Sequence, residues 1–344
     1  MTKHLISLAA MLALAAPLAA QEEPQGAPSP NEIVAKAGAK EWIAIPAEDL
    51  MVMTLAPAAD GSARKVVIQL MPAPFSQGWV ENIRTLARAK WYDDIAVNRV
   101  QDNYVVQWGD PNYDNPESEG TAKPLPEGLR VMAGSEYVVS LNEPAKAEAF
   151  SSLDRYLKKL PPNRTIASTI YQRDPYAAVN LAFRGWPMGM KFEFDEAGEI
   201  NAAAWPTHCY GMVGVGRNYS PDTGSGAELY TVIGHAPRHL DRNIALVGRI
   251  VEGMEHLSSL PRGTGALGFY SAEETDKRTP ILSIRVASDL PDSERPAFEY
   301  LSTDGETFGH YADARANRRD PFFIVPAGGA DICNIPVPVR RVGG

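Results

Sequence analysis

The sequence predicts a mainly β protein, built as an antiparallel barrel or sandwich with two helices. Short apolar runs recur along the chain, and most are joined by brief segments rich in Gly, Pro and Asp, a pattern typical of antiparallel sheets. Eight such runs are predicted as strands: 50–55, 66–70, 95–100, 104–108, 212–215, 229–233, 244–247 and 281–286. One early and one late helical stretch favour the closed form, because helices placed there can plug the open ends of a barrel.

Two helices interrupt the strand series. The first follows Ser76, the predicted N-cap residue, because five apolar residues after it share one helical face: Trp79, Val80, Ile83, Leu86 and Ala87. The second is predicted over about 251–260, and it ends before Pro261 because proline cannot continue a helix.

Two regions lie outside this pattern. Residues 112–187 break the strand rhythm and are predicted as an inserted, α-containing subdomain. After Pro144 its sequence has a helical pattern whose apolar face carries Phe150, Leu153, Tyr156, Leu157 and Leu160. Residues 291–344 are predicted as a C-terminal extension with short helices at 294–301 and 307–318, followed by a Pro- and Gly-rich tail.

The N-terminal residues 1–20 have the pattern of a secretory signal peptide. Lys3 precedes an apolar run over 5–16, and small residues follow, so cleavage is expected after Ala20. That run is shorter than the roughly 20 apolar residues of a transmembrane helix. The mature chain is therefore expected to be periplasmic or secreted and not membrane-spanning, with the polar, Pro-containing stretch 21–40 as a disordered leader.

Charge and cysteine content narrow the possible partners. The chain has 33 Lys and Arg against 42 Asp and Glu, and loss of Lys3 with the signal leaves 32 against 42, a net charge of −10. An acidic chain disfavours nucleic acid and anionic lipid as partners. Cys209 and Cys333 can form one disulfide in an oxidising compartment, pinning the tail to the barrel, and two unpaired thiols are the alternative.

The most specific motif lies in the middle of the chain. Residues 97–111 read Val-Asn-Arg-Val-Gln-Asp-Asn-Tyr-Val-Val-Gln-Trp-Gly-Asp-Pro. The segment resembles the cyclophilin signature F-H-R-V-I-P-x-F-M-x-Q-G-G-D. Five residues match it directly, namely Arg99, Val100, Gln107, Gly109 and Asp110, and two replace its Phe and Met, namely Tyr104 and Val105. Further family motifs follow in order at 226–230, 239–241 and 247–254.

This resemblance covers about residues 50–290, interrupted by the insertion. It implies a cyclophilin-like eight-stranded antiparallel barrel capped by two helices, and peptidyl-prolyl cis-trans isomerase activity on proline-containing polypeptides. Rotation about an amide faces a barrier of about 18–20 kcal/mol, and a catalyst lowers it by binding the twisted amide better than the planar forms. No cofactor or metal is expected, because the rotation requires neither.

The resemblance implies two catalytic residues, Arg99 and Gln107. A fixed guanidinium can stabilise the twisted amide electrostatically, since it stays charged and presents several donors in one plane. Gln107 matches the residue that orients this arginine and contacts the peptide backbone. The alternatives are a surface arginine held in an ion pair and a glutamine at a strand edge.

The resemblance also implies a substrate pocket. The apolar floor for the proline ring is expected from Tyr104, Val105, Tyr230 and Leu240. Further peptide contacts are expected from Val213, Gly214, Val215, Glu228 and His239. The alternative for the apolar residues is an ordinary place in the barrel core.

Several positions depart from the family pattern, and these are Asn98 for His, Trp108 for Gly, Gly214 for Asn, Glu228 for Gln, His239 for Trp, and Ile244 where His is frequent. Glu228 matters most, because a carboxylate near Arg99 can pair with the guanidinium and compete with substrate, or can hold it in place. The altered wall predicts weak isomerase activity.

Two other function classes stay open. One is a non-catalytic proline-peptide-binding or chaperone module on the same barrel, and the other is a structural or envelope-assembly protein. Six scattered histidines lack metal-ligand spacing, which disfavours a zinc site. The sequence around Gly224 and Gly226 lacks the G-x-S-x-G context of a hydrolase. The sequence does not address the oligomeric state.

Overall fold

The eight predicted strands close into one antiparallel barrel, which confirms the predicted fold class. The computed structural model describes residues 26–112, 120–141, 144, 148, 151, 174–194, 196 and 200–343. Around the barrel the strand order is β10-β11-β5-β4-β13-β2-β3-β12. The bounds are β2 (Leu50–Leu55), β3 (Arg64–Leu70), β4 (Ile95–Val100), β5 (Val105–Gly109), β10 (Met212–Val215), β11 (Leu229–Val232), β12 (Leu246–Glu252) and β13 (Pro280–Val286).

Alternation along the strands separates the barrel core from its outer face. Side chains of successive strand residues point to opposite faces. On β5, Val106 and Trp108 are fully buried in the core cluster, whereas Val105 belongs to a separate apolar cluster outside it. Burial of each large apolar side chain stabilises the fold by about 1.5–3 kcal/mol. Because one set of alternate residues is buried inside the barrel, the other set lies on its outer face.

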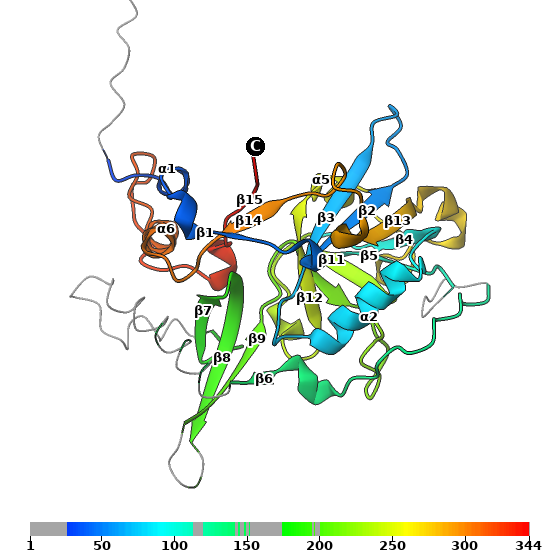
Figure 1. Ribbon diagram of the computed structural model, residues 1–344, viewed down its shortest axis with the longest axis horizontal. Helices are drawn as coiled ribbons and strands as arrows, with labels where there is room; N and C mark the ends of the chain where they lie inside the picture. The colour runs from blue at the N-terminus through cyan, green and yellow to red at the C-terminus, as the bar shows by residue number, and fades with distance from the viewer. Residues whose placement is uncertain are drawn as a thin grey trace, which may run out of the picture.

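Helix α2 (Gln77–Arg88) covers one end of the barrel, as predicted (Figure 1). All five residues of its predicted apolar face are buried in the core. Ser76 precedes the helix, but the prediction that it caps the helix is wrong: it adopts a left-handed φ of 54° and its side chain makes no capping hydrogen bond. Extended backbone is what directs an N-cap oxygen at the first amides.

The late helix is shorter than predicted. Residues 251 and 252 continue β12, and α5 spans only Glu255–Ser258. Gly253 separates the two elements, with φ at +84° and its Cα so close to the backbone of Lys65 that an added Cβ would lie 2.2 Å from the Lys65 carbonyl oxygen. Only glycine tolerates this combination, so the backbone turns sharply before the helix starts.

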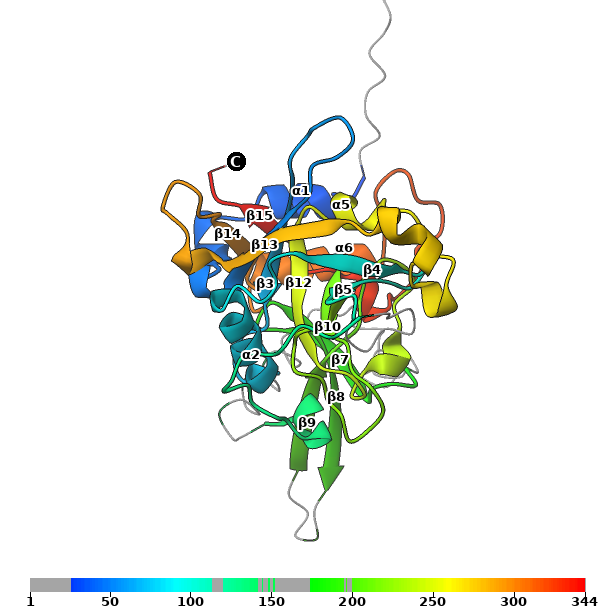
Figure 2. The same ribbon diagram turned by 90° about the vertical axis from the view of Figure 1, so that its right-hand side faces the viewer.

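The inserted region, predicted as an α-containing subdomain, contains a second sheet that was not predicted. Its four strands are antiparallel in the order β6-β9-β8-β7, and two of them form a long hairpin that extends away from the barrel (Figure 2). The bounds are β6 (Val139–Ser140), β7 (Val179–Phe183), β8 (Trp186–Phe194) and β9 (Ile200–Pro206). The predicted boundary at 187 is wrong, since it falls inside β8. The predicted helix carrying Phe150, Leu153, Tyr156, Leu157 and Leu160 lies outside the described residues.

The two ends of the described chain form a third unit beside the barrel. Strand β14 (Phe298–Leu301) pairs with β1 (Trp42–Ala44) and with β15 (Val339–Arg341), and α1 (Pro30–Ala35) packs on α6 (Glu306–Ala316). Figure 1 shows β1 and β14 running from the barrel towards these helices. Two predictions are wrong here, since 294–301 ends in a strand instead of a helix and the leader is ordered from residue 26. The helix predicted at 307–318 corresponds to α6.

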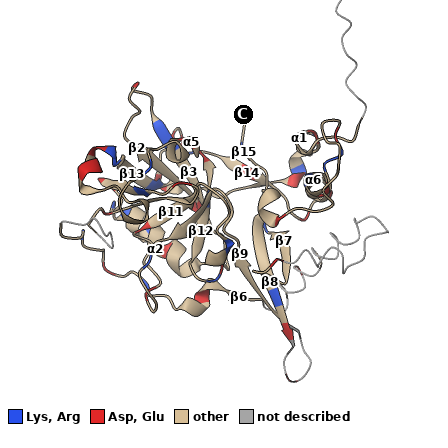
Figure 3. Cartoon of the chain, turned by 180° about the vertical axis from the view of Figure 1, so that it is seen from behind, with Lys and Arg blue, Asp and Glu red and all other residues tan. Residues whose placement is uncertain are grey.

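Short 3-10 helices occupy many connections: η1 (Ala39–Glu41), η2 (Ala47–Asp49), η3 (Gly134–Tyr137), η4 (Arg238–Leu240), η5 (Ala266–Gly268), η6 (Ala272–Lys277), η7 (Ala287–Asp289) and η8 (Ile332–Asn334). Cys209, just before β10, forms a disulfide with Cys333 in η8. Acidic and basic residues lie beside one another on many elements (Figure 3), as in the ion pairs of Arg88 with Glu48 and Asp289. Across the described ranges, no helix has the length and apolar character needed to cross a membrane.

Candidate active site

Arg99 lies on β4 at an irregularity in its pairing with β5. Its Nε donates to the carbonyl oxygen of Leu267 at 2.7 Å, and Nη1 donates to Oε1 of Gln107 at 3.2 Å. Nη2 donates to the side-chain oxygen of Gln101. Three neutral acceptors on three different segments therefore fix the plane of the guanidinium.

Aromatic rings and burial complete the setting of this cation. The Arg99 guanidinium carbon lies 5.7 Å from the ring centre of Tyr104 and 5.4 Å from that of Phe269. Burial lowers the pKa of Arg99 below its ordinary value. Within the described part of the chain no carboxylate lies within ion-pair distance of Arg99, so the surface ion-pair alternative does not hold. A half-buried cation acts more strongly on a neighbouring dipole than one in bulk water.

Register places Gln107 between Arg99 and the apolar cluster. Gln107 on β5 is opposite Arg99 on β4 and opposite Tyr230 on β11. Its side chain is 8% exposed, and its Oε1 accepts from Arg99. Three adjacent strands therefore bring a cation, an amide and an aromatic ring side by side on the outer face of the barrel.

The predicted pocket residues gather in an apolar cluster that is separate from the barrel core. Its buried members are Val105, Tyr230 and Val232, and packed against them are Tyr104, Leu240 and Ile244. Four of these were expected from the sequence. Val232 was missed, although it is two residues after Tyr230 on the same strand and so shares its face.

Two predicted contact residues do not face this cluster. The side chains of Val213 and Val215 are buried in the barrel core, because they alternate with Gly214 along β10. Only Gly214 lies against the cluster: a Cβ added to it would meet Tyr230 Oη at 2.3 Å. The glycine therefore leaves the space that the tyrosine hydroxyl occupies.

Comparison with known proteins identifies the family of this chain. Residues 62–286 match the family model described as cyclophilin type peptidyl-prolyl cis-trans isomerase/CLD. The chain belongs to this family. Peptidyl-prolyl cis-trans isomerisation is therefore its general activity. A search of curated protein sequences found no match.

A solved bacterial structure shares the fold of this cyclophilin. Cyclophilin AquaCyp293 from Hirschia baltica is 20% identical, with a TM-score of 0.59 over 90% of this chain and 96% of the other. A cyclophilin type peptidyl-prolyl cis-trans isomerase from Cryptosporidium parvum, solved in the presence of the dipeptide Ala-Pro, is 10% identical with a TM-score of 0.34, over 69% of this chain and 97% of the other.

Glu228, which replaces a Gln in the family motif at 226–230, does not reach Arg99. Its side chain is 4% exposed and lies over Gly109, where an added Cβ would be 1.9 Å from Glu228 Oε1. No ion pair joins Glu228 and Arg99, both of which are described, so Glu228 neither competes with substrate for the guanidinium nor holds it in place through such a pair. Trp108, a departure within the signature segment 97–111, is fully buried in the core.

Two further departures from the family pattern, Asn98 and His239, make contacts within the site region. The Asn98 side chain is buried and donates to the Gly109 carbonyl oxygen at 3.0 Å. The His239 ring stacks on Tyr104, with centroids 6.4 Å apart and an angle of 9° between the planes. His239 therefore meets the edge of the cluster through an aromatic contact, although it is smaller than the family's Trp.

A hydrogen-bonded histidine lies behind Tyr230, and no sequence motif predicted it. His208 Nε2 lies 2.9 Å from Tyr230 Oη, and His208 Nδ1 lies 2.9 Å from Asp241 Oδ1. His208 and Asp241 are 33 residues apart, so no local spacing could have linked them. Among the described residues, no group of three or more His, Cys, Asp and Glu is arranged to hold a metal ion.

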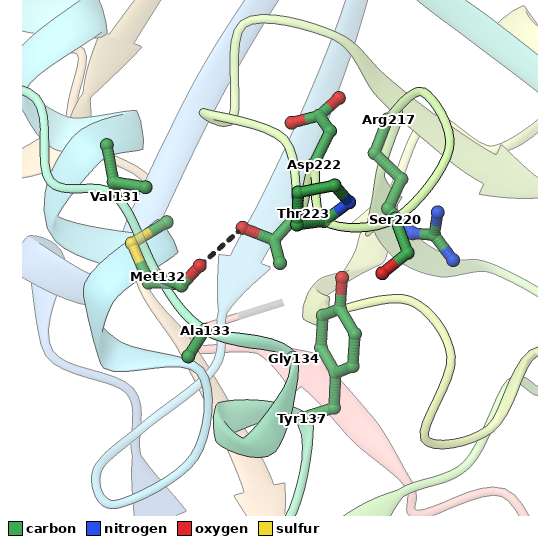
Figure 4. A pocket seen from close by; sticks show the side chains of 10 residues that line it. Val131, Met132, Ala133, Gly134, Tyr137, Arg217, Ser220, Asp222 and Thr223 are labelled. Carbon is green, nitrogen blue, oxygen red and sulfur yellow. Dashed lines mark hydrogen bonds between the residues drawn. The ribbon is translucent and has the colours of Figure 1, made fainter.

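A cavity of about 360 Å³ opens between the insertion and the loop that joins β10 to β11 (Figure 4). The Thr223 hydroxyl donates to the Met132 carbonyl oxygen at 2.8 Å, and this hydrogen bond connects the two walls of the cavity. The lining residues are Val131, Met132, Ala133, Gly134, Tyr137, Arg217, Ser220, Pro221, Asp222 and Thr223. The cavity was not predicted, because its walls come from segments about 90 residues apart.

Proposed function

We propose that the outer face around Arg99 isomerises X-Pro bonds of exported proteins. Arg99 stabilises the twisted amide, and the Tyr104, Val105, Tyr230 and Leu240 side chains hold the proline ring. The observation that carries this proposal is a fixed, half-buried guanidinium that neutral acceptors hold beside an apolar cluster.

The chemistry follows from what an amide loses when it twists. Planar resonance is broken in the transition state, and the proline nitrogen regains a lone pair that can accept a hydrogen bond. A cationic donor that is already in place stabilises this form more than either planar form, which is the condition for catalysis. Because Gln107 occupies Nη1 through its Oε1, its own amide NH₂ can donate to a peptide carbonyl and align the chain.

The decisive experiment measures isomerisation of an Ala-Pro tetrapeptide by wild type, Arg99→Ala and Arg319→Ala. We expect Arg99→Ala to lower kcat/KM on the order of a hundredfold, the usual loss on removal of one preorganised donor. Arg319→Ala is the control, since this exposed arginine pairs with Asp313 in the C-terminal extension. Equal rates for wild type and Arg99→Ala would remove Arg99 from the mechanism.

The same proteins separate catalysis from binding. Titration with an Ala-Pro peptide gives Kd for each protein whether or not it isomerises the X-Pro bond, because isomerisation leaves the covalent bonds of the peptide intact. If wild type shows no turnover and the Arg99→Ala variant still binds the peptide, the non-catalytic binding or chaperone module would be favoured. No proline-dependent binding at all would favour a scaffold role.

Export is the second part of the proposal. The pattern of residues 1–20 is that of a cleaved secretory signal, and the Cys209–Cys333 disulfide suits an oxidising compartment. Mass spectrometry of the protein from the periplasm or medium should show Gln21 as the first residue. Leu12→Arg, which interrupts the apolar run, should leave the full-length chain in the cytoplasm. A wild-type chain that keeps Met1 and stays in the cytoplasm would contradict export.

A further inference from the structure

We propose that His208 is a positioning residue of the proline pocket. It draws the hydroxyl of Tyr230 away from the apolar surface, so that a tyrosine can serve as the floor of a pocket that must stay apolar. This inference rests on the proposed function, because it concerns the same pocket.

The position of the Tyr230 hydroxyl is fixed from two sides. His208 Nε2 lies 2.9 Å from Tyr230 Oη, and the two rings are nearly parallel, with an angle of 13° and centroids 6.4 Å apart. On the other side the hydroxyl fills the space that Gly214 leaves by lacking a Cβ. Tyr230 is 5% exposed and His208 is 1% exposed. A buried hydroxyl without a partner is costly, so this hydroxyl depends on His208.

Hydrogen bonding determines the direction of the Tyr230–His208 contact. Asp241 Oδ1 accepts the backbone amide of His208 at 2.9 Å and also lies 2.9 Å from Nδ1. A carboxylate can only accept, so this contact selects the imidazole tautomer with the proton on Nδ1, whose Nε2 is an acceptor. Burial raises the pKa of Tyr230 well above its ordinary value, so the phenol keeps its proton and donates it to Nε2.

Further ion pairs hold Asp241 in place. Arg238 Nε donates to Asp241 Oδ2 at 2.6 Å, and Arg238 Nη2 donates to Asp174 Oδ2 at 2.8 Å. Asp241 directly follows Leu240, a member of the apolar cluster. The network therefore supports the pocket at two points, the Tyr230 ring and the loop that carries Leu240.

A double-mutant cycle distinguishes this role from a general structural one. The proteins are wild type, His208→Leu, Tyr230→Phe and the double variant, and the measurements are Kd for the Ala-Pro peptide together with kcat and KM. In His208→Leu the Tyr230 hydroxyl has no acceptor, so we expect Kd and KM to rise about tenfold, within the range for an unsatisfied buried group, with kcat changed less than about threefold.

The double variant decides the matter. With Phe at position 230 there is no hydroxyl to satisfy, so His208→Leu should add less than about twofold to Kd in that background. Equal effects of His208→Leu in both backgrounds, with normal folding, would overturn the inference and leave the proposed function intact. Coupling in Kd without turnover in any protein would overturn isomerisation by this site and leave the positioning role standing.

A conservative variant guards against misfolding. If His208→Leu does not fold, His208→Gln replaces it, because the glutamine amide oxygen can accept from Tyr230. Its Kd should lie within about threefold of wild type. A tenfold loss in folded His208→Gln that persists with Tyr230→Phe would count against the inference, and wild type that binds no proline peptide would overturn both proposals.

Discussion

At the scale of single residues, the loop opposite Arg99 matters as much as the strand that carries it. Leu267, whose carbonyl oxygen accepts from Arg99 Nε, has a left-handed φ of 55°. Phe269 pairs with Arg99 through a backbone bridge and places its ring near the guanidinium. The orientation of Arg99 therefore depends on a loop whose strained backbone must be held by other contacts.

Glu274 supplies those contacts. Its carboxylate accepts from Lys277 Nζ at 2.7 Å and from the backbone amides of Thr264 at 2.9 Å and Ser271 at 3.1 Å. These bonds, led by the one from Lys277, lower the pKa of Glu274 to about 2 from an ordinary 4.5. The carboxylate thus joins both ends of the segment that contains Leu267 and Phe269.

This arrangement predicts an effect of pH. A carboxyl group whose pKa is depressed in the folded state stabilises the fold above its unfolded pKa, and that contribution is lost as pH falls from about 4.5 towards 2. Glu274→Gln should be less stable to urea than wild type at pH 7, and the difference should shrink near pH 2. At pH 7 the variant should also lose about three- to tenfold in kcat/KM, because Arg99 is less well oriented.

The neighbouring Glu273 provides the control. It is exposed, and Glu273→Gln should match wild type in urea unfolding and in kcat/KM at both pH values. A Glu274→Gln variant whose stability deficit is the same at pH 7 and near pH 2 would show that its carboxylate charge does not hold the loop.

At the scale of the site, contiguous residues were predictable and assembled ones were not. Arg99 and Gln107 lie within one motif, and a strand pair brings them together. His208 and Phe269 meet the site only after the barrel closes, so each looked like an isolated residue in the sequence. Asp241 was recognised within the motif at 239–241, but nothing in the sequence linked it to His208. Glu228 was expected near Arg99 for a similar reason. The sequence shows that Glu228 replaces the family's Gln, but only the closed barrel shows that Gly109 leaves room for its carboxylate.

At the scale of elements, the barrel strands were predictable because their pattern is local. Each is a short apolar run between turn residues, and the predicted bounds differ from those of the structure by a few residues. Strand β12 shows the limit, since it was placed at 244–247 but spans Leu246–Glu252. Buried Arg249 interrupts its apolar pattern, held by Gln69 Oε1 at 2.8 Å and by the Trp186 ring.

Elements outside the barrel depend on partners far away in the chain. Strand β14 has the sequence Phe-Glu-Tyr-Leu, which fits a helix or a strand until β1 and β15 flank it. The leader is a different case, because its helix α1 has a local signal that was overlooked: Ser29 and Glu32 form a capping box. Packing of Ile33 and Val34 in the cluster of Phe308 and Tyr311 completes its order.

At the scale of the whole molecule, Arg238 ties the three parts together beside the pocket. It is 5% exposed and pairs with Asp241 of the barrel and Asp174 of the inserted region. A longer contact of 3.7 Å reaches Asp331, which caps η8 in the C-terminal extension. The inserted region and the extension are therefore bound to the barrel at the loop that carries Leu240, and their docking bears on the pocket.

The Cys209–Cys333 disulfide makes the same connection covalently, and it predicts a measurable loss. The bond closes a loop between cysteines 124 residues apart, and on the chain-entropy model such a crosslink stabilises the fold by about 5 kcal/mol. Cys209→Ala/Cys333→Ala should lower the free energy of unfolding in urea by up to that amount.

Wild type unfolded in the presence of a reductant should match the variant, and the variant without urea should keep kcat/KM within about threefold. Identical urea midpoints for oxidised wild type, reduced wild type and the variant would mean that Arg238 and the packed sheets hold the extension without help from the crosslink.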